Sequence, residues 1–198
     1  MDLVNKSKYN IILGSGSSRR KELLGMTGIN FSVMSIPVDE SFPDSLQGTE
    51  ISEYIVKNKS KAFNKLIKEN EIIITADTLV WFENKCLGKP KDKKEAKYML
   101  KLFAGKSHDV ITSVGFLTIS NFKILTESTT VIYKNLTDSE IDYYVENVNP
   151  IDKAGSYGIQ DWIGMIGVEH VNGSYTSVLG LPVPQTTNQI IKIINENL

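Results

Sequence analysis

The sequence predicts an α/β protein with a mixed β-sheet, and three observations support this fold class. Apolar residues recur at helical spacing in several segments, for example within residues 50–69 and 92–105. Short, continuous apolar runs such as residues 72–76 are typical of buried strands. Two longer apolar segments flank Ser120-Asn121-Phe122-Lys123, which predicts an antiparallel hairpin. Helices and strands therefore mix along the chain, and at least one pair of strands is antiparallel.

The N-terminal segment reads as a strand, a turn and a helix. Residues 10–13 predict a short apolar strand, residues 14–18 a Gly/Ser turn, and residues 18–26 a helix that stops near Gly28. Residues 31–36 then alternate as a strand, which leads towards two acidic residues.

The middle of the chain places an acidic residue beside apolar strands. Residues 50–69 predict a helix, and residues 72–76 predict a buried strand with Asp77 directly at its end. A second strand is expected over residues 78–82, and a capped helix over residues 92–105. The C-terminal half is expected to contain, in chain order, the hairpin strands 110–119 and 124–133, a helix from the capping box of Thr137 and Glu140 to about Val148, a strand over 165–171, a turn at Asn172-Gly173 and a final helix opened by Pro184.

Length and composition favour one globular domain over residues 1–198, since 41% of the residues are hydrophobic and 23% are charged. The net charge of −1 argues against a general nucleic-acid binder but leaves room for a local site for a small polyanion. The single cysteine, Cys86, cannot form an internal disulfide, and no apolar run approaches membrane-spanning length. We therefore expect a cytoplasmic protein without a membrane or nucleic-acid partner.

The two arginines among the 22 basic residues stand side by side in the first loop, as Arg19 and Arg20. Glycines and a helix N-terminus present backbone N–H groups to an anion. The planar guanidinium adds paired donors that suit phosphate oxygens better than an ammonium does. The loop therefore indicates a phosphate site. The alternative is an ordinary strand-to-helix turn with two solvated arginines.

Acidic residues near apolar strands give candidates for the chemistry. Asp77 is the strongest, because the apolar residues on both sides make a charge there costly unless it is used. For Asp39 or Glu40 taken alone, a loop acid or a helix cap is the favoured interpretation. Carboxylates beside a phosphate suit Mg²⁺, with Mn²⁺ as the alternative.

Three lysines are candidates to neutralise phosphate charge, although any single lysine is more often a solvated surface residue. They are Lys61, Lys89 in the rigid turn Gly88-Lys89-Pro90, and Lys153. A small-residue loop follows Lys153 and ends in Gln160, whose amide can both donate to and accept from a base edge.

Taken together, these motifs resemble the Maf family of nucleoside triphosphate pyrophosphatases. The matching pieces occur in the family's order over residues 11–182, nearly the whole chain. They are Leu13-Gly14-Ser15-Gly16-Ser17-Ser18-Arg19-Arg20-Lys21-Glu22-Leu23-Leu24, Val38-Asp39-Glu40, Lys61-Ala62, Ala76-Asp77-Thr78, Leu87-Gly88-Lys89-Pro90, His108-Asp109-Val110-Ile111-Thr112, Asp152-Lys153-Ala154-Gly155-Ser156-Tyr157-Gly158-Ile159-Gln160, Gly173-Ser174-Tyr175 and Gly180-Leu181-Pro182.

The resemblance implies a two-lobed α/β fold around a long mixed sheet, with flanking helices, a cleft between the lobes and frequently a homodimer. It also implies hydrolysis between the α- and β-phosphates of a nucleoside triphosphate, with Asp77 as the proton acceptor. Glu40 and Asp77 would then serve the divalent cation. The residues that would cradle the triphosphate are Ser15, Arg19, Arg20, Lys61 and Lys89.

The family divides by substrate at three positions, which here are Arg19, Thr78 and Gln160. This combination resembles the branch acting on dTTP and UTP in a nucleotide-pool house-cleaning role, and modified pyrimidine triphosphates such as 5-substituted uridine triphosphates are further candidate substrates. The chain departs from the family pattern at Gly14 and Ser18 in the first loop, where Ser18 is a good helix N-cap, and at Asp161 after the amide. The alternative function is a non-catalytic, nucleotide-binding regulator linked to septum formation.

Overall fold

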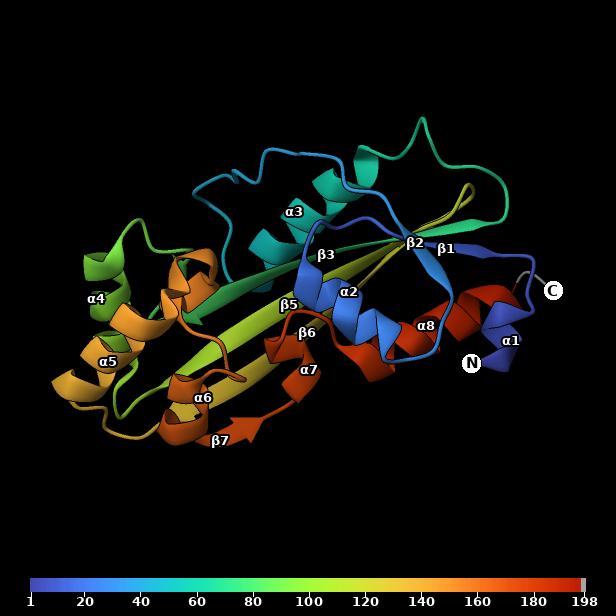
Figure 1. Ribbon diagram of the computed structural model, residues 1–198. Helices are drawn as coiled ribbons and strands as arrows, with labels where there is room; N and C mark the ends of the chain where they lie inside the picture. The colour runs from blue at the N-terminus through green and yellow to red at the C-terminus, as the bar shows by residue number, and fades with distance from the viewer. Residues whose placement is uncertain (197–198) are drawn as a thin grey trace.

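A computed structural model describes residues 1–196 and shows a long, twisted sheet with helices on both faces (Figure 1). The sheet has seven strands in the order β2-β1-β3-β5-β6-β7, with β4 added to the edge of β3. The strands are β1 (Asn10–Leu13), β2 (Phe31–Val33), β3 (Glu71–Phe82), β4 (Lys85–Leu87), β5 (Ser107–Leu117), β6 (Phe122–Tyr133) and β7 (Val168–Asn172).

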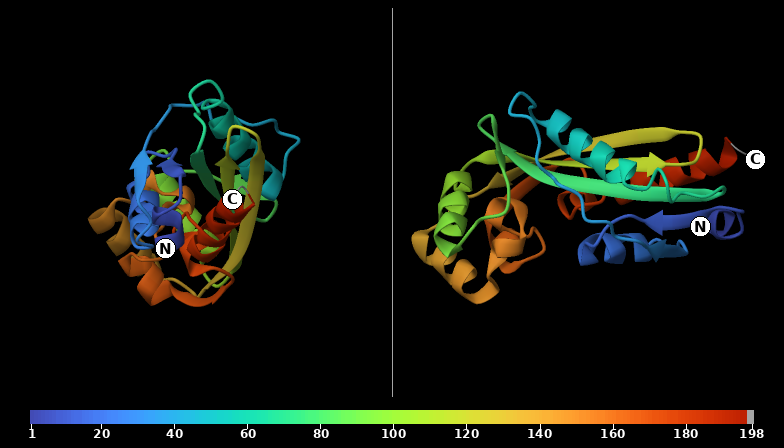
Figure 2. Two further views of the ribbon diagram at one scale, coloured as in Figure 1. Left: turned by 90° about the vertical axis from the view of Figure 1, so that its right-hand side faces the viewer. Right: turned by 90° about the horizontal axis from the view of Figure 1, so that it is seen from above.

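Helices cover the sheet unevenly, and this divides the molecule into two lobes. The helices are α1 (Asp2–Asn5), α2 (Ser18–Gly25), α3 (Thr49–Lys61), α4 (Lys93–Phe103), α5 (Asp138–Val148), α6 (Trp162–Gly167), α7 (Tyr175–Val178) and α8 (Val183–Asn195), with single 3₁₀ turns at Pro150–Asp152 and Ala154–Ser156. Figure 2 shows α3 on one face of the sheet, α2 on the other face, and α4 and α5 at the far end.

The sheet is mixed, as predicted. Strand β1 runs parallel to both β2 and β3, whereas β3, β5, β6 and β7 pair antiparallel in turn. The predicted hairpin is confirmed as β5 and β6, and the predicted capping box of Thr137 and Glu140 starts α5.

Two large apolar clusters form the cores of the two lobes. One cluster packs β1 and the first half of β3 against α2 and α8, and includes Leu13, Leu24 and Ile190. The other packs the second half of β3 against α4, α5 and α6, and includes Phe103 and Tyr144. The predicted α/β class, with a long mixed sheet and flanking helices, is therefore confirmed.

The strand that carries Asp77 differs from the sequence-based expectation. Two strands were expected, with Asp77 at the end of the first, but β3 runs unbroken from Glu71 to Phe82 and Asp77 lies near its middle. Pairing with β5 explains the continuity, because Asp77 lies opposite Ser113 within an uninterrupted antiparallel ladder. The acidic residue inside the apolar run therefore did not indicate the end of a strand, because Asp77 lies within β3.

Other boundaries also shifted. Strand β2 ends at Val33, earlier than expected, so Glu40 lies in the loop between β2 and α3 rather than at a strand end. Helix α3 also ends earlier than expected, at Lys61. Residues 165–167, expected in a strand, belong to α6, where Ile166 packs against the second apolar cluster and Met165 is exposed. The short elements α1 and β4 had no sequence signal that we recognised. Within residues 1–196, no helix is long and apolar enough to cross a membrane.

Candidate active site

The first loop links β1 to α2 through local hydrogen bonds that leave its amide groups near the cleft. Ser17, rather than the expected Ser18, is the N-cap of α2, and its side chain accepts from the Arg20 N–H at 3.4 Å. Ser15 Oγ accepts from the Ser17 N–H at 3.3 Å. A Cβ on Gly14 would lie 3.0 Å from the Phe63 ring, so the loop is packed closely against the end of α3.

Asp77 and Thr78 lie at a gap in the edge of the sheet. Strand β1 pairs with β3 only as far as Ile74, and β4 begins to pair with the same edge at Val80. Residues 75–79 are therefore paired with β5 on one side but have no neighbouring strand on the other. Because side chains alternate along a strand, Asp77 points towards α3 while Thr78 points towards α2. The gap lets both side chains reach one cavity.

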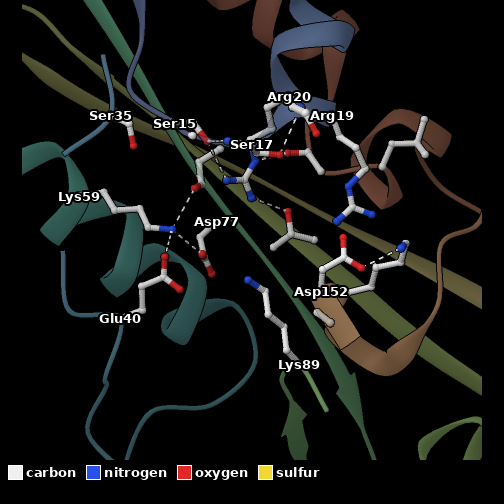
Figure 3. Close-up of a pocket in the computed structure, with 18 of the residues that line it drawn as sticks. Ser15, Ser17, Arg19, Arg20, Ser35, Glu40, Lys59, Asp77, Lys89 and Asp152 are labelled. Carbon is white, nitrogen blue, oxygen red and sulfur yellow. Dashed lines mark hydrogen bonds and ion pairs between the residues drawn. The ribbon is translucent and has the colours of Figure 1, made fainter. Parts of the chain in front are cut away.

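The cavity has a volume of about 550 Å³, which is the size of a small-molecule site. It lies between the first loop, the gap in β3, the loop around Lys89 and the segment that follows Lys153 (Figure 3). Five basic side chains line it, namely Arg19, Arg20, Lys59, Lys89 and Lys153, against the three carboxylates of Glu40, Asp77 and Asp152. An excess of positive charge in one cavity favours a polyanionic ligand.

Lys59 holds the two candidate metal-binding carboxylates together. Its Nζ lies 2.8 Å from Glu40 Oε1 and 2.8 Å from Asp77 Oδ1, and it also donates to the Ala76 carbonyl at 3.4 Å. Partial burial raises the pKa of Glu40, but the hydrogen bond and charge of Lys59, together with Lys89 and Arg20, outweigh it and leave that pKa below its ordinary value. Both acids therefore face the cavity beside a compensating cation.

Lys61 was expected in the cradle, but the structure places it elsewhere. Its side chain is exposed, its Nζ contacts Asn58 Oδ1 at 3.3 Å, and it does not line the cavity. Residues two apart on a helix are separated by about 200° around the axis, so Lys59 and Lys61 cannot face the same side of α3. The 3.6-residue period of α3 could have identified Lys59, because Ile55 and Ser52 on the same stripe are buried against the sheet.

Arg20 is held by three hydrogen bonds from its guanidinium. Its Nε donates to the Gly180 carbonyl at 2.9 Å, and its two terminal nitrogens donate to Ser15 Oγ at 3.3 Å and Thr78 Oγ1 at 3.1 Å. Burial lowers the pKa of Arg20, while the charges of Asp77 and Glu40 oppose that shift. This arginine is fixed before any ligand arrives.

Arg19 and the two remaining lysines reach the cavity from other sides. Figure 3 shows Arg19 directed towards Asp152, and Lys89 directed upwards between Asp77 and Asp152. Lys153 pairs with Asp152 at 2.8 Å and lies 3.7 Å from an oxygen of Asp161. Part of the charge of Lys153 is thus already balanced by carboxylates that the sequence alone did not single out.

Gln160, expected to read the base, is exposed and does not line the cavity, although the preceding Gly158 and Ile159 do. The loop is fixed just behind them, because Tyr144 donates to Asp161 Oδ2 at 2.8 Å and accepts from the Gly158 N–H at 3.3 Å. Thr78 lines the cavity, but its hydroxyl is bonded to Arg20 and to Thr112.

The donor set fits a hard divalent cation that also binds phosphate. Two carboxylates, Glu40 and Asp77, converge on the Lys59 ammonium, so the protein already places a positive charge between them. The described residues contain no cluster of three or more acidic, histidine or cysteine ligands. Such a sparse set suits Mg²⁺, which commonly takes one or two carboxylates and completes its shell with water and substrate phosphates.

Fold and site together define an α/β protein with a cationic cleft that suits a small polyanion. The chain belongs to the Maf-like protein family, whose model matches residues 10–193.

Curated relatives support this membership over nearly the whole chain. A dTTP/UTP pyrophosphatase of Bacteroides fragilis is 46% identical over 95% of this chain and 98% of its own length. A dTTP/UTP pyrophosphatase of Flavobacterium psychrophilum is 47% identical over 87% of this chain and 88% of its own. Among solved structures, the Staphylococcus aureus Ham1 protein is a remote likeness, with a TM-score of 0.44, 11% identity, and coverage of 64% of this chain and 72% of that chain.

Proposed function

We propose that this protein is a nucleoside triphosphate pyrophosphatase that hydrolyses dTTP and UTP to the monophosphate and pyrophosphate. The observation that supports it most is the meeting of Glu40, Asp77 and Lys59 in the wall of a cavity that is also lined by two arginines and two further lysines. The curated relatives named dTTP/UTP pyrophosphatase support the activity and the substrate.

In this proposal the triphosphate lies across the first loop, and its charge is met from several sides. Arg19 and Arg20 supply planar donors at the N-terminus of α2, while Lys59, Lys89 and Lys153 supply ammonium groups around the cavity. Ser15 is held beside Arg20 by a hydrogen bond and presents its hydroxyl to the same place. Lys59 takes the role first given to Lys61.

Asp77 is proposed as the general base. The oxygen of a water molecule forms a bond to the α-phosphorus, the bond from that phosphorus to the bridging oxygen breaks, and pyrophosphate leaves. Asp77 accepts the water's proton, and Lys59 stabilises the carboxylate in position. The cationic residues offset the charge that builds on the phosphate oxygens as the bond breaks.

A divalent cation, Mg²⁺ or alternatively Mn²⁺, is proposed to be held by Glu40 and Asp77, where it would polarise the phosphate oxygens and neutralise their charge. The carboxylate at Asp77 also favours an enzyme over a regulator that only binds nucleotide. A protein that only binds nucleotide gains nothing from a carboxylate beside the phosphates, because the carboxylate repels them unless a metal ion bridges the two.

Base selection is proposed to come from the segment that ends in Gln160. Gly158 and Ile159 line the cavity, and Gln160 is exposed just beyond them. In this proposal a base that extends past the cavity wall meets the Gln160 amide, which can pair with the alternating donor and acceptor groups of a uracil or thymine edge. Arg19 and Thr78 complete the proposed specificity set. Cytosine presents a different order of groups, which leaves polar atoms unpaired at a cost of roughly 1–3 kcal/mol each.

We further propose that residues 1–198 work as one catalytic domain, in the cytoplasm, as a homodimer and without a nucleic-acid partner. The near-neutral net charge of −1 supports the last point.

A pyrophosphate-release assay over a panel of nucleoside triphosphates, with and without Mg²⁺ or Mn²⁺, tests the proposal. We expect the highest kcat/KM for dTTP and UTP, and turnover only with a divalent cation. A purine triphosphate as the best substrate would contradict the specificity but not the activity. Nucleotide binding without pyrophosphate release for every substrate would instead support the binding-only regulator.

A further inference from the structure

A chain of hydrogen bonds links Arg20 to a buried part of the sheet that does not touch the cavity. The Arg20 guanidinium donates to Thr78 Oγ1 at 3.1 Å, and Thr78 Oγ1 lies 3.0 Å from Thr112 Oγ1 on β5. Thr112 Oγ1 in turn donates to the Ser177 carbonyl of α7 at 2.7 Å. Thr112 is fully buried and does not line the cavity.

The two ends of this chain fix the direction of every hydrogen bond in it. A guanidinium can only donate, and a carbonyl oxygen can only accept. Thr112 must therefore donate its single hydroxyl proton to the Ser177 carbonyl oxygen. The proton between the two threonines must then come from Thr78, which accepts from Arg20 and donates to Thr112. Only one pattern of donors and acceptors satisfies all of these hydrogen bonds, so the orientations of the Thr78 and Thr112 hydroxyl groups are both fixed.

A second bond closes the chain into a ring through α7. Arg20 Nε donates to the Gly180 carbonyl at 2.9 Å, and Gly180 lies two residues beyond the end of α7 at Val178. Thr129 on β6 clamps the start of the same segment, because its Oγ1 lies 2.8 Å from Ser177 Oγ and accepts from the Ser174 N–H at 3.0 Å. The hydrogen bonds of Arg20 to Gly180 and to Thr78 therefore both depend on the position of α7 relative to the sheet.

The anchors decide what Arg20 can offer to a ligand. A guanidinium has five N–H donors, and the three hydrogen bonds to Gly180, Ser15 and Thr78 occupy one on each nitrogen. Two donors, one on each terminal nitrogen, remain, and the fork geometry makes them suitable for phosphate oxygens. Holding the other three in place prepares these two before the ligand arrives.

We propose that Thr112 is a positioning residue that, through Thr78, holds Arg20 in the orientation that binds the triphosphate. The inference rests on the proposed function for the identity of the ligand, but it concerns the placement of one side chain rather than the chemical step. Thr78 thereby acts on the phosphate site by way of Arg20, whatever contact it also makes with the base.

The test is a double-mutant cycle between Thr112→Val and Arg20→Lys. Valine keeps the shape of threonine and removes the hydroxyl, while lysine keeps the charge of Arg20 and removes the fork. The readout is the Kd of α,β-imido-dUTP, measured by calorimetry, because this probe needs no turnover. Thr112→Ser restores the hydroxyl. Ser113→Ala is the matched control, because Ser113 is the next residue of β5, is equally buried, and bonds Ser52 and Thr126 on the opposite face.

We expect Thr112→Val to weaken binding roughly tenfold in the wild-type background and by less than about twofold in the Arg20→Lys background. Thr112→Ser should bind within about twofold of the wild type, and Ser113→Ala should lower the melting temperature without changing Kd. Independent, additive effects of Thr112→Val and Arg20→Lys would overturn the proposal, as would equal weakening by Thr112→Ser. Pyrophosphate release by the wild type is measured separately, so a failure of the catalytic proposal would show there and not in the binding cycle.

Discussion

Lys59 forms ion pairs with Glu40 and Asp77, whereas Lys61 faces solvent two residues along the same helix. We expect Lys59→Met to lower kcat/KM by roughly tenfold or more, because it leaves the buried Asp77 carboxylate and the more exposed Glu40 carboxylate without their cation and increases repulsion of the triphosphate. Lys61→Met is the matched control and should keep near-wild-type kinetics. Steady-state kinetics on both variants decide between the two lysines, and a larger loss at Lys61 would show that our placement of the cradle is wrong.

Asp77 is mostly buried, and its carboxylate is directed at the cavity. We expect Asp77→Asn to reduce kcat by about 10²–10⁴-fold while nucleotide binding survives, because the amide keeps the shape but cannot accept the water's proton. Asp39→Asn is the control, since Asp39 is exposed, caps Ser41 and lies outside the cavity. Turnover by Asp77→Asn close to that of the wild type would remove Asp77 from its proposed role.

Residue types in the sequence identified much of this site, but not its three-dimensional partners. Arg19, Arg20, Glu40, Asp77, Lys89 and Lys153 were all named in advance, and all line one cavity. Lys59 was missed because the choice between it and Lys61 depends on the rotational phase of α3 against the sheet. Asp152 and Asp161 were given no role in the site, because their pairing with Lys153 depends on the folded arrangement of these residues.

At the scale of elements, α6 supports the segment that forms one wall of the cavity. A Cβ on Gly164 would lie 2.6 Å from the Cα of Ile159 and closer still to its carbonyl group. We expect Gly164→Ala to lower the free energy of unfolding by roughly 1–3 kcal/mol and to raise KM, because the backbone of Ile159 must shift. The matched control is Gly25→Ala in α2, where a Cβ meets no atom within 4 Å and a small gain in stability of about 0.4–1 kcal/mol is expected. The free energy of unfolding and KM are measured for both variants. If Gly164→Ala changed neither quantity more than Gly25→Ala does, the proposed support of Ile159 by α6 would be contradicted.

Elements with local signals were predicted well, and elements defined by distant partners were not. The capping box of α5, the Asp92 cap of α4 and the hairpin of β5 and β6 each depend on neighbouring residues, so the sequence revealed them. The continuity of β3 depends on β5, which begins 25 residues after β3 ends. Residues 165–167 satisfy both a strand and a helix pattern, and packing of α6 against Tyr133 and Leu136 decides for the helix.

At the scale of the whole molecule, one buried imidazole links stability to pH. His108 stacks on Phe103 and lies 2.7 Å from the Tyr157 hydroxyl, and burial lowers its pKa from 6.5 to about 3. Below pH 6.5 the His108 imidazole therefore binds a proton in the unfolded chain, whereas in the folded protein it does so only near pH 3. The free energy of unfolding should consequently fall as pH decreases within this window, by up to about 1.4 kcal/mol per pH unit from this group.

Urea denaturation at pH 7, 6 and 5 measures this contribution. We expect the free energy of unfolding of His108→Gln to vary less steeply with pH than that of the wild type, by up to about 1.4 kcal/mol per pH unit. His170→Gln serves as the control, because His170 is exposed on β7 and an exposed imidazole is solvated in both states. Parallel pH profiles for the wild type and His108→Gln would contradict the assignment.

The unbroken ladder between β3 and β5 has a mechanical consequence. It runs from Ile73 opposite Leu117 to Trp81 opposite Asp109, beneath both cores, and β6 continues it along the full length of β5. Rotation of one lobe against the other would strain many of these ladder hydrogen bonds at once. We therefore expect the sheet to be rigid, with the cavity at the gap in the edge of β3. We therefore expect entry and release of a nucleotide to depend on residues 34–48, the long connection from β2 to α3 that borders the cavity and carries Glu40. Movement of such a connection would belong to the nanosecond-to-microsecond motions of loops rather than to the slower rotation of domains.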